Sequence, residues 1–456
     1  MEKLFKLKEH GTTVRTEIMA GITTFLTMAY ILAVNPGMLA VTGMDKGAVF
    51  TATALAAALA TVIMGLLANY PVALASGMGL NAYFAFSVCL GSLKDETDPW
   101  KIALTAVLIE GVIFIILSLF KFRETLVNTV PENLKHGITA GIGLFIAIIG
   151  LKGAGIVVSD PSTLVALGDL STAPVALAMI GILVIGVMLY FNVKGAILWG
   201  ILATWILGII AELCGWYVVD VEKEAYSLIP QFSSASDFLP KSLAPTFFQF
   251  NFGYVAKNFA NFAIIVFSFL FVDLFDTVGT LVGVANKGNL LDKDGKLPKV
   301  GRALMADAIG TVAGACLGTS TVTSYVESSA GVAEGGRTGL TALTTAALFI
   351  VALFLSPIFL AIPGFATAPA LVIVGLFMMS SVLKMKFEGD MADVLGGFVA
   401  IIMMPFTYSI ANGIMFGMLA WIILKLVRGK IKDIHPVMIV VGLLFIVRII
   451  SLVMHW

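Results

Sequence analysis

The chain has 456 residues, of which 59% are hydrophobic and 12% are charged, and its formal net charge is zero. Soluble domains carry about 25% charged residues, so this chain has too little charge to cover a water-exposed surface. Without an excess of positive charge, the composition gives no indication of a nucleic-acid partner. Its mean hydropathy of +1.01 predicts a protein whose outer surface contacts membrane lipid.

Fourteen stretches are apolar and long enough to be spanning helices, which need about 20 residues. A fifteenth apolar stretch, 437–454, contains Arg448 and is interpreted as an interfacial or peripheral helix, with a further span as the open alternative. The expected fold class is therefore an all-α polytopic membrane protein with 14 transmembrane segments. These segments are 17–37, 48–69, 72–90, 101–120, 134–151, 174–191, 195–211, 256–285, 304–317, 319–334, 338–356, 366–384, 391–408 and 410–427.

Basic residues collect in alternate loops between these segments. The N-terminal segment, the 286–303 loop and the stretch after residue 427 are rich in Lys and Arg, whereas the loops between them on the other side hold few. Because cytoplasmic loops are enriched in basic residues, this alternation predicts a cytoplasmic N-terminus.

Internal repetition is present but weak. The run Ala-Ile-Leu-Trp-Gly-Ile-Leu-Ala at 196–203 resembles Gly-Ile-Met-Phe-Gly-Met-Leu-Ala at 413–420, in the seventh and fourteenth segments. Seven is odd, so a repeat of this length places its two copies in opposite orientations, as in many secondary transporters. Chance similarity between two apolar helices is the alternative.

The third and tenth segments open with unusual sequences. The stretch 71–84 is rich in glycine and small residues, and the stretch 318–329 is rich in Ser, Thr and Val. We expect each segment to begin with a short extended piece followed by a half-helix. Such backbone survives at membrane depth only inside protein or beside a water-filled cavity, so the pair indicates a binding site. Two kinked helices without a ligand are the alternative.

Acidic residues inside spans are costly and usually functional. Asp273 and Asp276 are three residues apart and share one helix face, Glu327 follows the break in the tenth segment, and Asp307 and Glu110 lie in neighbouring segments. Like charges in a dry site disfavour each other's ionisation, which suits a proton carrier. A structural hydrogen bond to a neighbouring helix is the alternative for each.

The residue types in the candidate segments restrict the chemical class of ligand that could bind there. Segments one, three, eight and ten contain no interior Lys or Arg, so an anionic ligand is disfavoured. Carboxylates and the Asn81 amide suit a ligand with several N–H donors. Aromatic residues in the same segments could stack on a flat heterocycle, or could serve only packing: they are Tyr83, Phe84, Phe275 and Tyr325.

The sequence shows no arrangement of catalytic residues that is typical of an enzyme. The four histidines are terminal or lie in loops, the cysteines show no metal-ligand spacing, and no phosphate-binding Gly-Lys-Ser/Thr loop occurs. The sequence therefore predicts no cofactor and no metal, and any energy for transport would come from an ion gradient.

Four motifs in order resemble the AzgA-like adenine/guanine/hypoxanthine permeases of the nucleobase–ascorbate transporter superfamily. The resemblance covers essentially the whole chain. It implies a seven-plus-seven inverted repeat that carries purine bases with protons. The motifs are Gly-Ile-Thr-Thr-Phe-Leu-Thr-Met-Ala-Tyr at 21–30, Gly-Met-Gly-Leu-Asn-Ala-Tyr-Phe at 77–84, Phe-Val-Asp-Leu-Phe-Asp-Thr-Val-Gly-Thr at 271–280 and Thr-Ser-Tyr-Val-Glu-Ser at 323–328.

The resemblance implies binding positions at Asn81, Asp273, Asp276 and Glu327, with Asp307 in support. The coupling proton would be taken up by one of these acidic residues. The implied division is a core domain (1–120 and 256–356), a gate domain (121–215 and 357–430), an outer loop (216–255) and the C-terminal segment 431–456.

The expected activity is purine import by proton symport with alternating access in the inner membrane. An anion carrier of the same fold, similar to sulfate transporters, a passive facilitator and a membrane-embedded enzyme are the alternatives. The preferred purine, sodium in place of protons, and assembly as a homodimer stay open.

Overall fold

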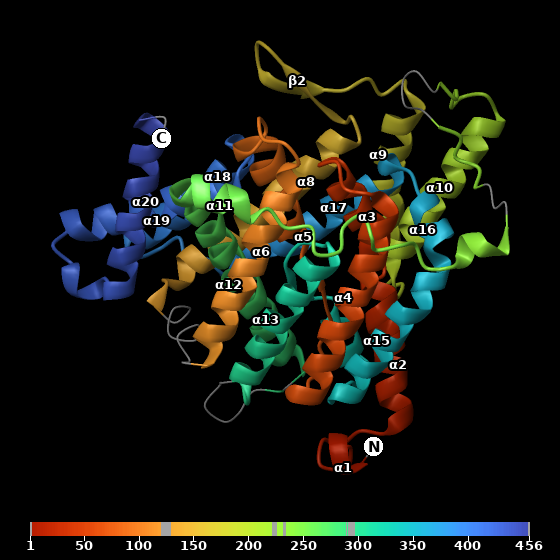
Figure 1. The fold of residues 1–456 in the computed structure, drawn as a ribbon, viewed down its shortest axis with the longest axis horizontal. Coiled ribbons are helices and arrows are strands. Elements are labelled where there is room, and N and C mark those ends of the chain that lie inside the picture. The colour runs from red at the N-terminus through yellow and green to blue at the C-terminus, as the bar shows by residue number, and fades with distance from the viewer. Residues whose placement is uncertain are drawn as a thin grey trace.

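The computed structural model describes residues 2–119, 129–220, 226–230, 234–288, 290 and 297–454. Within these residues the protein is a bundle of helices with two short two-stranded sheets (Figure 1). Ten of the described helical stretches are long and apolar enough to cross a membrane, and four shorter apolar helices accompany them. The expected helical, polytopic membrane fold is confirmed.

In the first half of the chain, the strands are β1 (Leu74–Ser76), β2 (Val157–Asp160) and β3 (Leu164–Leu167). The helices are α1 (Glu2–Phe5), α2 (Val14–Met28), α3 (Ile31–Ala40), α4 (Lys46–Leu67), α5 (Met78–Ala82), the π-helix η1 (Tyr83–Ser92), α6 (Pro99–Leu119), α8 (Glu132–Gly153), α9 (Ala173–Tyr190) and α10 (Ala196–Leu213).

In the second half, strand β4 (Val322–Ser324) is accompanied by the short 3₁₀ turns η3 (Ala235–Phe238), η4 (Leu353–Leu355), η5 (Ser380–Lys384) and η6 (Ile431–Asp433). The α-helices are α11 (Phe252–Lys257), α12 (Phe259–Gly288), α13 (Val300–Leu317), α14 (Ser328–Ala333), α15 (Gly339–Ala352), α16 (Ser356–Ala361), α17 (Gly364–Met379), α18 (Met391–Phe406), α19 (Ile410–Val427) and α20 (Pro436–Met454).

Several expected segments consist of more than one helix. The first is divided into α2 and α3, and the eighth is preceded by α11, which ends at Lys257. The eleventh extends beyond residue 356 through η4 into α16. Pro357 stands at the start of α16 and has no backbone N–H, so the regular α-helical bonding is interrupted where η4 lies.

The helices pack in two groups. In one, α4 packs against α13 and α15, α15 against α2, and α13 against α6. In the other, α8 packs against α17 and α18, α18 against α19, and α9 against α10 and α17. Gly143 of α8 and Gly375 of α17 permit backbone contact, because a Cβ on either would lie 2.6 or 2.5 Å from the carbonyl oxygen of the other. In a lipid environment the hydrophobic effect does not drive helices together, so membrane helices associate through close packing at small residues.

Both expected extended pieces are present, and they pair with each other as a two-stranded sheet, which is called the β1–β4 crossing below. β1 and β4 pair antiparallel, with Ala75 opposite Thr323. The amide of Gly77 donates to the Thr321 carbonyl at 3.0 Å, and the amide of Tyr325 donates to the Ala73 carbonyl at 3.0 Å. The two broken segments therefore satisfy each other's backbone inside the bundle, as non-helical backbone at membrane depth requires.

The β2–β3 hairpin between α8 and α9 is a feature that the sequence analysis did not predict. Its residues Val158 and Leu164 are exposed, so the hairpin has no buried apolar face that would give a clear alternating pattern. In Figure 1 it lies at the upper end of the bundle, opposite α1.

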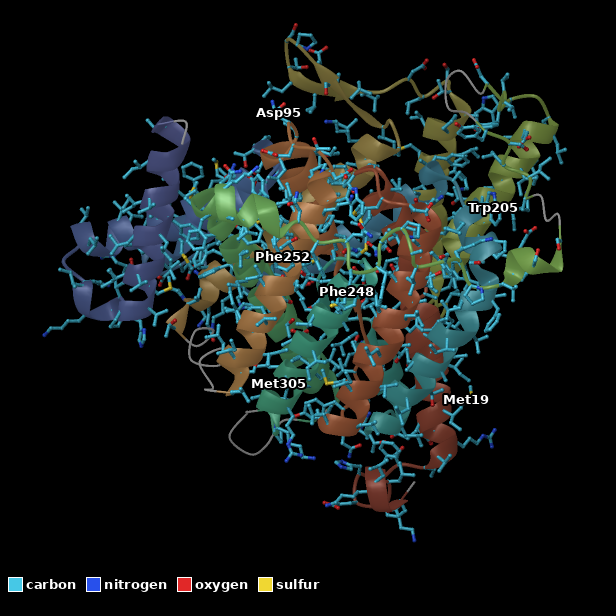
Figure 2. The ribbon with its side chains drawn as sticks, in the orientation of Figure 1. Met19, Asp95, Trp205, Phe248, Phe252 and Met305 are labelled. Atoms are coloured by element: carbon cyan, nitrogen blue, oxygen red, sulfur yellow. The ribbon has the colours of Figure 1, made fainter. Side chains whose placement is uncertain are left out.

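Part of the segment that precedes α12 runs across the bundle as an aromatic strip. Phe247, Phe248, Phe250 and Phe252 contact one another in sequence, with ring centroids 4.7 to 5.9 Å apart. The amide of Phe248 donates to the Cys316 carbonyl at 2.9 Å and so attaches the strip to α13. Phe248 and Phe252 lie on the near side of the bundle in Figure 2.

Candidate functional site

Side chains reinforce the crossing of β1 and β4. The hydroxyl of Tyr325 donates to the carbonyl oxygen of Ser76 at 2.6 Å, and the Thr311 hydroxyl donates to the Val322 carbonyl at 3.0 Å. Tyr325 is almost fully buried. This expected aromatic residue therefore has a defined structural contact at the place where the two half-helices begin.

Asn81 belongs to the same network. Its Oδ1 accepts hydrogen bonds from the hydroxyls of Ser76, at 2.8 Å, and Ser320, while its Nδ2 donates to the Ser76 carbonyl at 3.4 Å. The side chain is fully buried. The structure thus places Asn81 beside the break, as expected, with its amide bonded to the two broken segments.

Glu327 stands at the N-cap position of α14 and is partly buried. Its Oε1 accepts a hydrogen bond from the hydroxyl of Tyr30, at the junction of α2 and α3, at 2.6 Å. The backbone carbonyl of Glu327 also accepts a bond from Thr27 at 3.4 Å. The first segment and the tenth segment therefore meet at this carboxylate.

Asp273 and Asp307 share a hydroxyl. Both side chains are fully buried, and the Thr277 hydroxyl lies 3.0 Å from Oδ1 of each. Thr323 of β4 contacts the same hydroxyl at 2.7 Å. The two carboxyl oxygens consequently lie within about 6 Å, a range over which negative charges repel each other. The expected supporting position of Asp307 corresponds to this arrangement.

Asp276 faces a different set of neighbours from Asp273. Its Oδ2 would lie 3.4 Å from a Cβ added to Gly77, at the N-cap of α5. It is also close enough to Asp307, Glu327, Tyr30 and Tyr325 to interact with them electrostatically. The helix face that carries both aspartates therefore lies beside two acidic groups, one around Thr277 and one around Glu327, and Asp276 is close to both.

The remaining aromatic candidates are held by packing. Tyr83 and Phe84 are buried and both contact Phe269 of α12, at ring-centroid distances of 4.8 and 6.4 Å. The side chain of Phe275 lies outside the described residues. Of the four aromatic candidates, Tyr325 is the one whose described bonds lie at the crossing itself.

Comparison with known proteins identifies the family. The model of the Permease family, Xan_ur_permease, matches residues 15–416. The chain belongs to this family. It is therefore a multi-pass membrane transport protein and not an enzyme, and the resemblance seen in the motifs is confirmed.

Curated relatives of the permease match along their full length. The adenine permease AdeP of Escherichia coli is 42% identical over 100% of this chain and 97% of its own. The guanine/hypoxanthine permease PbuO of Bacillus subtilis is 46% identical over 98% of this chain and 99% of its own.

Solved structures share the fold at low identity. The transmembrane domain of a cyanobacterial bicarbonate transporter, BicA, superposes with a TM-score of 0.63 at 16% identity, over 89% of this chain and 97% of that one. The structure of SLC26A9 gives 0.62 at 11% identity, over 91% and 66%. The permease therefore has the fold of these proteins.

Sequence reasoning missed two residues of the site. Tyr30 is the hydrogen-bond donor to Glu327, and Thr277 joins Asp273 to Asp307. Both lie in motifs that carry the family resemblance, one directly after Thr-Met-Ala and the other directly after Asp276. Their positions gave a signal, but their partners depend on which helices become neighbours.

Two further buried carboxylates have structural partners. Glu110 of α6 accepts a hydrogen bond from Thr321 at 2.9 Å, next to β4. Glu17 of α2 accepts bonds from the backbone N–H of Arg337 at 2.9 Å and of Thr341 at 3.2 Å, at the start of α15. An anion there satisfies helix N–H groups that have no partner within the helix.

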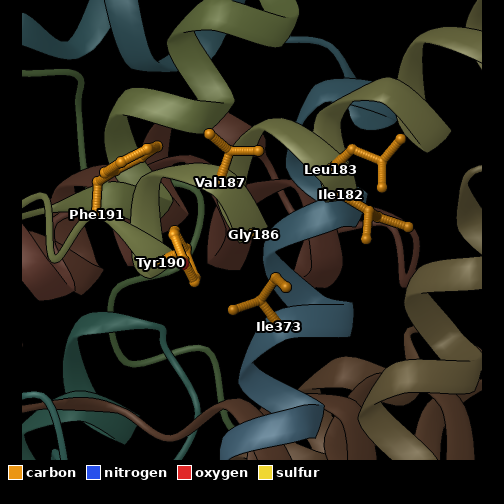
Figure 3. Close-up of a pocket in the computed structure, with 7 residues that line it drawn as sticks. All are labelled: Ile182, Leu183, Gly186, Val187, Tyr190, Phe191 and Ile373. Carbon is orange, nitrogen blue, oxygen red and sulfur yellow. The ribbon is translucent and has the colours of Figure 1, made fainter.

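An apolar surface hollow lies away from these polar groups. It is lined by residues of α9 and its C-terminal end, including Leu183 and Tyr190, together with Ile373 of α17 (Figure 3). No charged side chain lines it, and both Leu183 and Tyr190 are exposed. This hollow has the chemistry of a lipid-facing surface, so we place the candidate site at the β1–β4 crossing.

Proposed function

We propose that this permease imports purine nucleobases across the cell membrane by proton symport and alternating access. Relatives at 42% and 46% identity over nearly their whole length are named as permeases for adenine and for guanine and hypoxanthine. The observation that carries the proposal is the hydrogen bond from Tyr30 to Glu327 where two broken segments pair, with Asp276 beside Gly77 at the start of α5.

Purine chemistry suits this crossing. A purine presents ring and exocyclic N–H donors, and carboxylates accept such bonds with a contribution of roughly 1.5–3 kcal/mol each. Glu327 is half-buried and already has its Oε1 fixed by Tyr30, so its other oxygen is held in a defined direction. We assign Glu327 and Asp276 as direct acceptors, and Asn81 and Tyr325 as the groups that keep the crossing in shape.

The second acidic group suits proton coupling. The Thr277 hydroxyl has one proton and can donate to only one of Asp273 and Asp307 at a time. Adding a proton to this pair removes the repulsion between two nearby carboxylates in a dry site. The substrate-loaded site, once neutral, would then move past the low-dielectric barrier at a lower free-energy cost.

The proposed movement is of one helical group against the other. We propose fourteen spans in a seven-plus-seven inverted repeat, with a core domain of 1–120 and 256–356 and a gate domain of 121–215 and 357–430. The two packed groups, around α4 and α13 and around α8 and α17, support this division. Lys194 and Glu334 form an ion pair between the two at 2.8 Å, and its partial exposure suits a contact that breaks and re-forms.

An anion carrier is the second candidate, because BicA, a bicarbonate transporter, has the same fold. Its identity of 16% supports the fold alone. An anion would want a cation beside the half-helices, whereas the described groups at the crossing are acidic or neutral.

Uptake into proteoliposomes tests the proposal. Liposomes that contain the purified protein should accumulate radiolabelled adenine, guanine, hypoxanthine or xanthine when the liposome interior is made alkaline. Protein-free liposomes should not accumulate these bases. Purine accumulation driven by a sodium gradient alone would show that sodium, and not the proton, is the coupling ion. Equilibration without accumulation would indicate a passive facilitator. Uptake of bicarbonate or sulfate without purine uptake would establish the anion carrier.

A further inference from the structure

The last helix, α20, carries an arginine in the middle of its apolar sequence. Arg448 is partly buried, while Leu444, Val447 and Ile450 around it are exposed. The helix has 19 residues and so is about 28 Å long, close to the thickness of the hydrocarbon core. A charged residue in such a helix is costly and normally has a polar partner inside the protein.

Arg448 has such partners on other segments. Its Nη1 donates to the Ser268 hydroxyl of α12 at 3.0 Å. The Tyr83 side chain lies close enough to Ser268 and Arg448 to interact with both electrostatically. The Nε of Arg448 is buried and makes no hydrogen bond with the described residues. One guanidinium thus reaches the beginning of η1 and the middle of α12 together.

Both contacts lead into the candidate site. Ser268 lies five residues before Asp273 on α12, and Tyr83 lies two residues after Asn81. The ring of Tyr83 packs edge-on against Phe269, next to Ser268, at a centroid distance of 4.8 Å. A shift of Tyr83 would therefore affect two parts of the site: the broken segment that carries Asn81, and helix α12, which carries Asp273.

Packing holds α20 in this position. Phe445, three residues before Arg448, contacts Phe267 and Phe271 of α12 at centroid distances of 5.5 and 6.0 Å. On α19, Ile422 approaches Gly442 so closely that a Cβ on this glycine would lie 2.7 Å from its Cδ1. The guanidinium is therefore delivered by a helix that contacts α12 on one side and α19 on the other.

We propose that Arg448 is a positioning residue of the substrate site, which acts by holding the Ser268 hydroxyl of α12 and the Tyr83 side chain beside it. The inference rests on the proposed function, because it treats the β1–β4 crossing as the purine site. A guanidinium is a planar fork with several N–H donors and can serve two hydroxyls at once. Lysine is a point charge on a flexible stem, so it would hold one hydroxyl well and the other poorly.

Purine affinity of the purified, full-length protein tests the inference, measured by calorimetry beside the melting temperature. Arg448→Met should weaken the affinity for the best-bound purine roughly 2- to 30-fold, the usual range for a residue that acts through another. Arg448→Lys should fall between the wild type and Arg448→Met. Val447→Ala is the matched control: it shortens the exposed neighbour of Arg448 on the same helix, and it should leave affinity within about twofold.

A double-mutant cycle identifies the route. In a background that carries both Ser268→Ala and Tyr83→Phe, Arg448→Met should weaken affinity further by less than about twofold, because both hydroxyls near the guanidinium are gone. Unchanged affinity in Arg448→Met, an equal loss in Val447→Ala, or fully additive effects in the cycle would each overturn the inference. If Arg448→Met does not fold, Arg448→Lys decides, and wild-type affinity in that variant overturns it. A wild-type protein that binds no purine overturns the proposed function itself, and this inference with it.

Discussion

The Tyr30 hydroxyl donates a 2.6 Å hydrogen bond to Oε1 of Glu327, although the two residues are 297 positions apart in the chain. The bond joins the end of α2 to the start of α14. It fixes the direction of the carboxylate that we assign to the substrate. It also makes separate predictions for the two partners, because Tyr30 acts through Glu327 in the proposed site.

Glu327→Gln should weaken purine affinity roughly 10- to 150-fold, close to the effect of Glu327→Ala. The amide keeps the shape of the side chain but turns an N–H₂ donor toward donors of the purine. Tyr30→Phe keeps the acceptor and should cost less, about three- to tenfold. Calorimetry on the folded variants measures these values. Near-normal affinity in Glu327→Gln with a lowered melting temperature would show that the carboxylate is only structural.

Asp273→Asn should separate coupling from binding. If a proton shared between Asp273 and Asp307 drives transport, purine accumulation driven by a pH gradient should fall at least about tenfold in this variant. A tenfold fall corresponds to about 1.4 kcal/mol. Exchange of internal unlabelled for external labelled purine, which needs no net proton movement, should stay within about threefold of the wild type. Equal loss of exchange and accumulation would instead place Asp273 directly on the substrate.

Asn81→Ala should affect both affinity and stability, because the amide oxygen accepts bonds from Ser76 and Ser320 at the crossing. Leaving two buried hydroxyls without this acceptor costs about 1–3 kcal/mol. Asn81→Asp, which retains an acceptor oxygen, is the matched control and should bind purine better than Asn81→Ala. Unchanged purine affinity and an unchanged melting temperature in Asn81→Ala would remove this residue from the site.

An ion cluster at the start of α18 predicts acid sensitivity. Hydrogen bonds from Lys425, at 2.8 Å, and Lys430, at 2.9 Å, hold the pKa of Asp390 well below its usual range. A carboxyl whose pKa is lower in the folded state adds stability that is fully present above its unfolded pKa, near 3.9, and is lost as the pH falls toward the folded value.

Asp390→Asn keeps an N-cap side chain for α18 but removes the charge. The melting temperature of this variant in detergent should therefore be lower than that of the wild type at pH 7, and the difference should shrink as the pH is lowered below about 4. A difference between the two proteins that does not change with pH would exclude ionisation of Asp390 as the cause.

Membrane orientation can be read from a matched pair of cysteines in a variant without Cys89, Cys214 and Cys316. An impermeant maleimide should label Asp160→Cys, in the β2–β3 hairpin, in intact cells. It should label Lys8→Cys only after permeabilisation, because the basic N-terminal segment is proposed to be cytoplasmic. Figure 1 places strand β2 and helix α1, which precedes Lys8, at opposite ends of the bundle. Labelling of Lys8→Cys in intact cells would reverse the proposed topology.

The sequence by itself determined where many of the long apolar helices lie and where two segments are broken. The stretch 410–427 coincides with α19, and 48–69 lies within two residues of α4 at each end. The extended pieces β1 and β4 fall inside the two segments that are too rich in glycine or in Ser and Thr to start an ordinary helix. These are local properties, since apolar length decides a span and residue type decides where a helix fails.

Only the tertiary structure decided the partners. Nothing in the spacing of Tyr30, Thr277 or Arg448 states that they meet Glu327, Asp307 and Ser268, because each pair joins residues of different helices. The sequence predicted that Asp273 and Asp276 share a helix face, and the structure places that face beside two acidic groups. Helix packing makes this choice, because it determines which segment lies opposite each turn of α12.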